Sequence, residues 1–387
     1  MDNRAPLWMI AATVLNRAGG FIMVLILGHA IAPGLLADYF SALVSIGVAV
    51  SITQAGCGPL LVRLAQNRQQ TAILGIVSLR IILALIAITF LAPALPPVAW
   101  PVLIMPLAAA LSPDWMITAR LQFHRILWIG GLGQLAGIVT ALYAGTTSNG
   151  AVWIYACAPA ISATSCLASA FWAWSGRRKP RQGRANTSPG LPSLNIKIWP
   201  QLVLFTLLAG LLPNIDVAFL QSSLPQSDHD ALMLVHRLLL LCAAGFSAIS
   251  GVLFARKQTG FARDVWLVLP ACGITLALLV LPDMALSVLF GHSPVNNADI
   301  LRIAAPWPLL LAIVLRHILI VQERAGHLLL AVVAVVLCVG GAGVLAQCGA
   351  VATIIMAMNV KLALLAGLLI CAPRFFVWRQ RYFACQS

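Results

Sequence analysis

Charged side chains that interrupt long apolar runs are the residues of this sequence that could do chemistry. A charge near the centre of a bilayer costs about 2.5–3.5 kcal/mol, so each one needs a partner or a function. Four cations stand near the middle or in the inner third of such runs: Arg17, Arg80, Arg316 and Lys361. A guanidinium fork or an ammonium in this setting suits a phosphate or a carboxylate, which indicates a site for an anionic substrate.

Acidic residues that could neutralise these cations are scarce in the first half of the chain. Only Asp38 and Asp114 lie near its apolar runs, and only Arg80 can reach down to Asp114. Snorkelling, or hydrogen bonding to backbone carbonyls, is the alternative role for each cation, although snorkelling works poorly from mid-membrane. We therefore predict a water-filled cationic cavity between two halves of the protein, in which these four cations are the substrate-binding residues.

One acid and one base stand at similar depth on consecutive apolar runs. Asp216 lies in the run 199–222 and Arg237 in the run 231–254, each in the outer part of its run. Because the connecting loop makes these helices antiparallel neighbours, we expect an Asp216–Arg237 ion pair. The pair either fastens the two helices or acts as a coupling site for an ion or a proton. Four amides within the runs either lock helices together, the favoured role, or bind a sugar: Asn16, Gln54, Gln134 and Asn214.

The elements that must position these residues follow from composition. Of 387 residues, 61% are hydrophobic and 9% are charged, which excludes both an ordinary soluble domain and a disordered chain. A bilayer-spanning helix needs about 20 apolar residues, so the length allows about twelve spans. The predicted fold class is therefore all-α, a polytopic membrane protein with about 12 transmembrane helices in two six-helix lobes. The predicted spans are 7–30, 35–56, 71–93, 98–118, 126–144, 150–174, 199–222, 231–254, 264–289, 301–322, 327–349 and 350–372.

Basic residues alternate between the loops and so predict the orientation. They concentrate in the even-numbered loops and at both ends of the chain, whereas Asp228, Asp230 and Asp299 lie in odd-numbered loops. Because cytoplasmic loops are rich in Lys and Arg, both termini are predicted to be cytoplasmic in a multi-pass protein of the inner (plasma) membrane. The net charge of +14 is therefore a topology signal, and no nucleic-acid partner is expected.

The longest polar stretch divides the chain into two lobes. We predict an N-terminal six-helix lobe over 1–175, a basic cytoplasmic linker over 176–198, a C-terminal six-helix lobe over 199–372 and a cytoplasmic tail over 373–387. A weak internal likeness between 37–63 and 231–256 favours a parallel repeat about an axis along the membrane normal.

Catalytic and metal-binding signatures are missing from the sequence. It contains no G-x-x-x-x-G-K-[ST], G-x-S-x-G or H-E-x-x-H motif, and its nine cysteines and seven histidines are scattered. We therefore expect no catalytic residue, no metal, no cofactor and no enzyme activity. The outer loops are short, and Asp228-His229-Asp230, their one acidic cluster, suits the N-terminus of the following helix.

Three segments carry a resemblance to a known family. Asn16–Gly47 is similar to a first hairpin with an Arg-containing helix, Ser112–Arg125 to a helix exit with Asp-Trp before a basic loop, and Leu211–Leu239 to an Asn-x-Asp helix. The chain thereby resembles the polysaccharide transporters, which include the O-antigen flippases, of the multidrug/oligosaccharidyl-lipid/polysaccharide (MOP) superfamily. It is short for that family, and Val217 follows Asp216 where members often carry Arg.

The resemblance implies a MATE-like transporter of two six-helix lobes with a cationic central cavity. It implies movement of a polyprenyl-pyrophosphate-linked oligosaccharide from the cytoplasmic to the outer leaflet, for O-antigen, capsule or exopolysaccharide synthesis. The implied partners are the lipid-linked oligosaccharide, membrane lipid, and polysaccharide polymerase and chain-length proteins. Two alternatives stay open: a cation-coupled multidrug exporter of the same fold, and a membrane-embedded polysaccharide polymerase or glycosyltransferase.

Overall fold

The structure is a computed structural model that describes most of residues 5–384. The stretches outside the description are 1–4, 55–56, 67–68, 121, 176–202, 205–206, 209–210, 212–213, 221–223, 256–260, 291–296, 324–350 and 385–387. All the elements within the described part are helices, which confirms the predicted all-α class. Seven described helices are long and apolar enough to cross a membrane, or up to eight if one bent pair counts as a single span. The predicted linker 176–198 and the span 327–349 lie outside the described residues.

The amino-terminal half follows the predicted spans closely. Its helices are α1 (Ala5–Ala30), α2 (Pro33–Gln54), α3 (Gly58–Gln66), α4 (Gln70–Leu91), η1 (Ala92–Ala94), η2 (Pro97–Leu103), α5 (Ile104–Leu111), α6 (Asp114–Ala119), α7 (Phe123–Thr146), α8 (Gly150–Trp153), η3 (Ile154–Ala156) and α9 (Cys157–Ser175). The fourth predicted span is built from three pieces, η2, α5 and α6. Prolines cause these breaks, because Pro101 and Pro113 have no N–H to donate to the preceding turn.

The carboxyl-terminal half has the same helical character. Its described helices are α11 (Ile215–Leu220), α12 (Gln226–Ala255), α13 (Phe261–Val280), α14 (Pro282–Phe290), α15 (Asn297–Ala304), α16 (Pro306–Glu323) and α18 (Val351–Ala384). Helix α18 continues to Ala384, but the part that is apolar enough to cross a membrane is Val351–Cys371, close to the predicted 350–372.

A correction concerns the predicted span 264–289, which is not one helix. The chain bends by 98° between Val280 and Pro282, where α13 ends and α14 begins. Helix α13 has 20 residues, which at about 1.5 Å per residue is already long enough to cross the hydrocarbon core. Helix α14 is about as apolar as α13, so hydropathy alone did not separate the two helices.

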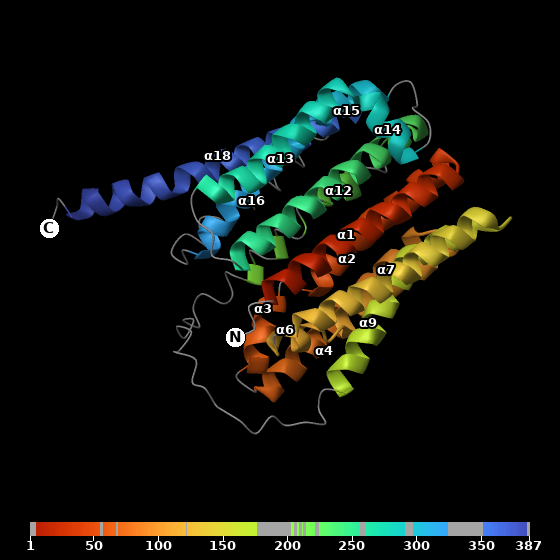
Figure 1. The fold of residues 1–387 in the computed structure, drawn as a ribbon, viewed down its shortest axis with the longest axis horizontal. Helices are drawn as coiled ribbons and strands as arrows, with labels where there is room; N and C mark the ends of the chain where they lie inside the picture. The colour runs from red at the N-terminus through yellow and green to blue at the C-terminus, as the bar shows by residue number, and fades with distance from the viewer. Residues whose placement is uncertain are drawn as a thin grey trace.

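The two halves meet along α1, α2 and α12. Figure 1 shows the helices from α1 to α9 (red to yellow-green) gathered in one bundle and those from α12 to α18 (green to blue) in another. Helix α12 packs against both α1 and α2, and α14 of the second half also contacts α1. Helix α1 begins and α18 ends toward the same end of the molecule in Figure 1, and their predicted cytoplasmic orientation stays a prediction.

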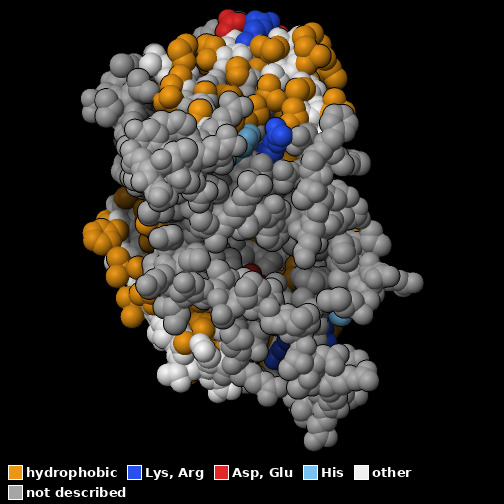
Figure 2. Space-filling view, turned by 90° about the vertical axis from the view of Figure 1, so that its left-hand side faces the viewer, with side chains coloured by type: hydrophobic (Ala, Val, Ile, Leu, Met, Phe, Trp, Pro, Cys, Tyr) orange, Lys and Arg blue, Asp and Glu red, His pale blue; other side chains and the backbone are white. Residues whose placement is uncertain are grey.

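The described outer surface is strongly apolar. Leu74, Phe90 and Leu167 are 67%, 76% and 72% exposed, as side chains that face lipid would be in a membrane. Figure 2 views the molecule from the left-hand side of Figure 1, and the described side chains along its upper part and left flank are mainly hydrophobic. Fold, helix length and surface together make this a multi-pass membrane protein.

Candidate functional site

Arg80 is buried inside the amino-terminal half, where its guanidinium bonds to a backbone carbonyl. The side chain lies on α4, is 5% exposed and donates from Nη2 to the carbonyl of Ala109 on α5. That carbonyl is in the last turn of α5, and the residue four positions on is Pro113, which has no N–H. Asp114 is close enough to Arg80 for electrostatic interaction. In this structure Arg80 therefore takes the alternative role named above for the cations, a hydrogen bond to a backbone carbonyl.

Asp216 and Lys361 form a buried ion pair in the carboxyl-terminal half. The Lys361 Nζ of α18 donates to Oδ2 of Asp216 on α11, and the two side chains are only 3% and 7% exposed. This corrects the expected Asp216–Arg237 pair. The expectation assumed that helices joined by a short loop also share charged faces, whereas the face of α11 that carries Asp216 packs toward the last helix of the half.

Arg237 has a different environment at the boundary between the halves. Its guanidinium carbon lies 5.2 Å from the ring centroid of Phe40, which joins α12 of the second half to α2 of the first. Within the described part of the chain, Arg237 makes no hydrogen bond or ion pair, and its Nε has no partner. Arg237 keeps accessible surface, although Ala231–His236 and Leu238 around it are buried.

An aromatic cluster of Tyr39, Phe40 and Tyr155 lies on the Phe40 side of this guanidinium. Tyr39 and Phe40 are 0% and 2% exposed, and the Tyr39 ring meets the edge of Tyr155 at a centroid distance of 5.8 Å. The Tyr39 hydroxyl is buried beside the Ala158 backbone and donates no hydrogen bond in the described structure. Sequence reasoning missed this cluster. The one sequence signal for the cluster was the Asp-Tyr-Phe triplet at 38–40, which places an acid and two aromatic side chains near the start of the apolar run 35–56.

The remaining predicted ligands are placed on helices of opposite halves. Arg17 lies on α1, and its side chain is outside the description; Arg316 lies on α16, is partly buried and has interactions of its own. Arg80 and Lys361 each have a separate partner, so the structure assembles no shared contact from these two. Their joint role in one cavity stays a prediction.

Helix packing by the predicted amides is confirmed at three of the four positions. In the first half, a Cβ on Gly19 would lie 2.5 Å from Cβ of Gln134, and Asn16 lies against Gly130 in the same way. Across the halves, a Cβ on Gly47 would lie 2.8 Å from Nδ2 of Asn214. The amides therefore fill the space that each glycine leaves. Two of these contacts join α1 to α7, and the third joins α2 to the start of α11.

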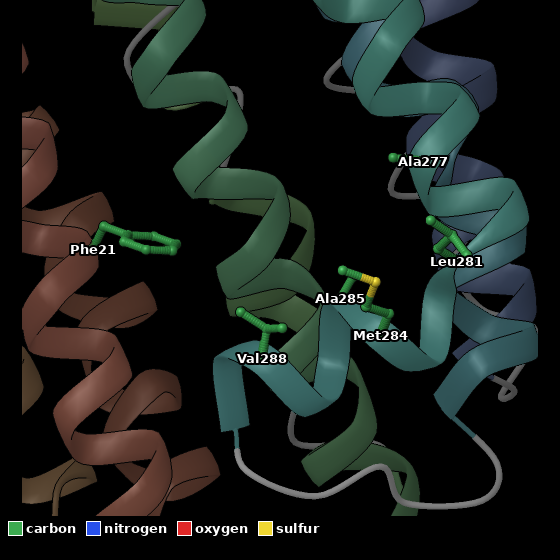
Figure 3. Close-up of a pocket in the computed structure, with 6 residues that line it drawn as sticks. All are labelled: Phe21, Ala277, Leu281, Met284, Ala285 and Val288. Atoms are coloured by element: carbon green, nitrogen blue, oxygen red, sulfur yellow. The ribbon is translucent and has the colours of Figure 1, made fainter.

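An apolar pocket of about 290 Å³ opens beside the bend between α13 and α14. Phe21 of α1 points toward it from the first half, and the other lining residues come from the second half (Figure 3): Ala277, Leu281, Met284, Ala285 and Val288. The pocket has no charged lining residue, so it offers hydrocarbon contact and no catalytic group. Among the described residues, no cluster of three or more His, Cys, Asp or Glu side chains could hold a metal ion.

Comparisons with known proteins define the fold class. The chain is similar to the MATE multidrug transporter DinF-BH, with a TM-score of 0.62 and 14% identity over 97% of this chain and 96% of that one. It is also similar to the inward-facing conformation of a multidrug resistance MATE family transporter of the MOP superfamily, with a TM-score of 0.60 and 14% identity over 98% and 99% of the two chains. No protein-family model and no curated protein matches the sequence. The fold is therefore that of the MATE transporters.

Proposed function

We propose that the protein is a flippase that moves a polyprenyl-pyrophosphate-linked oligosaccharide to the outer leaflet. The supporting observation is the excess of cations inside the long apolar helices. Arg80, Arg237, Arg316 and Lys361 lie within described helices, whereas two described acids lie near cations of this set: Asp216, which already pairs with Lys361, and Asp114, which lies within electrostatic range of Arg80. Such an interior suits an anionic headgroup.

The proposal gives each cation a role. Arg17, Arg80, Arg316 and Lys361 bind the pyrophosphate as it crosses, while the polyprenyl chain stays in the bilayer. In this conformation Arg80 and Lys361 are held by Ala109 and Asp216, so binding by either requires an exchange of partner. A membrane potential negative inside favours outward movement by about 2.3 kcal/mol per negative charge at 100 mV, which needs no built-in ATPase.

The multidrug exporter shares the fold, so the fold does not decide between the two. Charge favours the flippase, because a site for cationic drugs needs acids that are free to bind them, and Asp216 is already neutralised by Lys361. The embedded polymerase has no support from the described outer loops, which are short and carry no catalytic constellation.

The test is glycan analysis of a deletion strain, together with leaflet localisation of its lipid-linked oligosaccharide. We expect loss of surface polysaccharide, with intact repeat units trapped on the cytoplasmic leaflet. Complementation with Arg17→Gln or Arg80→Gln should fail at normal protein level. Arg302→Gln is the matched control, since it removes the same charge from an exposed pair on α15.

Two other results would contradict the proposal. Repeat units that reach the outer leaflet without polymerising would identify a polymerase. Normal surface glycan with altered drug tolerance would identify the multidrug exporter.

A further inference from the structure

Arg237 is a cation at the boundary between the halves whose hydrogen-bonding capacity is unused within the described structure. Phe40 covers one face of the guanidinium, at 5.2 Å from its ring centroid. A cation–π contact stabilises the charge but accepts no hydrogen bond, so the N–H groups in the guanidinium plane still need an acceptor. The Nε of Arg237 is buried and has no partner among the described residues.

Tyr39 supplies a second unsatisfied donor beside it. The hydroxyl is buried, lacks a hydrogen-bond partner in the described part and lies within electrostatic range of Arg237. A buried hydroxyl without a partner is destabilising, as is a buried charge without a counter-ion. An oxyanion placed between them would satisfy both groups at once.

The structure assigns an oxyanion-binding site to Arg237 and Tyr39, with Phe40 as the platform behind the guanidinium. The ligand class is a phosphate or pyrophosphate group, which matches the planar fork of arginine. That the group belongs to a lipid-linked substrate rests on the proposed function; the anion site itself does not. Because the same guanidinium joins α12 to α2, ligand binding also acts on the contact between the two halves.

The neighbouring contacts place this site at one end of that boundary. A Cβ on Gly34 at the start of α2 would lie 3.5 Å from Oδ2 of Asp230 at the start of α12, so the halves also touch here. Loop charges predict this end to be the outer side. Arg237 lies seven residues further along α12 than Asp230, about 10 Å inward, so the site lies in the outer part of the boundary, on the path by which an outward-moving headgroup would leave the protein.

The chain provides a matched control for the cation–π contact. The guanidinium carbon of Arg125 lies 4.9 Å from the ring centroid of Trp172, but this contact joins α7 to α9 within one half. Arg125→Met therefore removes an equivalent contact without touching the boundary. Tyr39→Phe removes only a hydroxyl that bonds to nothing in the described structure, so it keeps the packing of the site.

The experiment is hydrogen–deuterium exchange on the full-length protein in uncharged detergent, read on peptides covering 33–44 and 226–240. The probes are inorganic pyrophosphate, geranylgeranyl pyrophosphate and geranylgeraniol, which lacks the anion. For the wild type and Arg125→Met, we expect both pyrophosphate probes to slow exchange by about tenfold or more, as one charge-assisted hydrogen bond would. Geranylgeraniol should have no effect, and Tyr39→Phe should respond less than the wild type.

Arg237→Met should lose the response to both pyrophosphate probes. Equal protection of Arg237→Met and the wild type overturns the site, as does the absence of protection in the wild type. Protection by inorganic pyrophosphate alone upholds the oxyanion site and overturns its lipid-borne ligand. The two proposals can fail separately. If the pyrophosphate probes protect the protein but the deletion strain makes normal surface glycan, the anion site is upheld and the proposed flippase function is overturned.

Discussion

Most described glycines in the amino-terminal half lie against atoms of neighbouring helices, with Gly20, Gly58 and Gly75 as exceptions, whereas those described in the carboxyl-terminal half face open space. Gly133 and Gly137 of α7 lie directly against Ser165 and Ile161 of α9. A Cβ at Gly245, Gly273 or Gly367 would meet nothing within 4 Å. Close backbone approach thus packs the first half, as in other membrane helix pairs.

The second half joins its helices through side chains instead. The buried Asp216–Lys361 pair connects α11 to α18, and Nδ2 of Asn359 on α18 donates to the carbonyl of Ile303 on α15 at 2.7 Å. Polar contacts of this kind can break and reform, whereas packed glycines cannot slide without clashes. The comparison indicates a rigid first half and a second half whose helices can exchange partners.

The largest expected effect comes from breaking the buried pair of the second half. Asp216→Leu should lower the free energy of unfolding by about 3–5 kcal/mol, because Lys361 then loses its buried counter-charge. Asp216→Leu with Lys361→Met should recover most of that loss, since a buried pair can be replaced by apolar side chains. Thermal unfolding in detergent measures both changes. A double variant as unstable as the single one would show that the two charges do not act mainly on each other.

Overpacking the first half should have the next largest effect. Gly137→Val places methyl groups against Ile161 and should cost about 1–3 kcal/mol in stability, also read from thermal unfolding. Gly273→Ala in α13 is the matched change in the second half, where a helix gains up to about 1 kcal/mol from replacing glycine. Equal losses at the two positions would remove the contrast between the halves.

Arg80 offers a smaller test within the first half. Arg80→Leu leaves the Ala109 carbonyl without its donor but also removes a buried charge, so the net loss should be about 1 kcal/mol. Arg80→Lys keeps a donor and should recover part of it. A gain in stability from Arg80→Leu would mean that the charge is kept for substrate and not for the α4–α5 contact.

The smallest effect should come from the exposed pair on α15. Arg302 and Asp299 are 2.6 Å apart, but their side chains are 48% and 82% exposed. Arg302→Ala should therefore change the free energy of unfolding by less than about 0.5 kcal/mol, which the same melts can compare with Asp216→Leu. If Arg302→Ala lowered the free energy of unfolding as much as Asp216→Leu, burial would not determine how strongly the ion pairs of this half stabilise the fold.

Several features could be predicted because they depend on the chain locally. Apolar run length gave most of the described spans to within a few residues, as for α4 at Gln70–Leu91 against the predicted 71–93, but it missed the bend within 264–289. The fold class followed from composition, and the MATE-like architecture from the resemblance. Pairing of the charges could not be predicted in the same way. Asp216 and Lys361 are far apart in sequence, so no loop length or periodicity indicates that α11 lies against α18.

The sequence alone determined that this is an all-α membrane protein and where most of its described apolar helices lie. Those properties follow from residue types and the thickness of a bilayer, which act on each helix separately. Only the tertiary structure decided that Arg80 takes a carbonyl freed by Pro113, that Lys361 takes Asp216 and that Arg237 lies on Phe40. Each of these contacts depends on which helix faces meet, and packing across the whole molecule sets that.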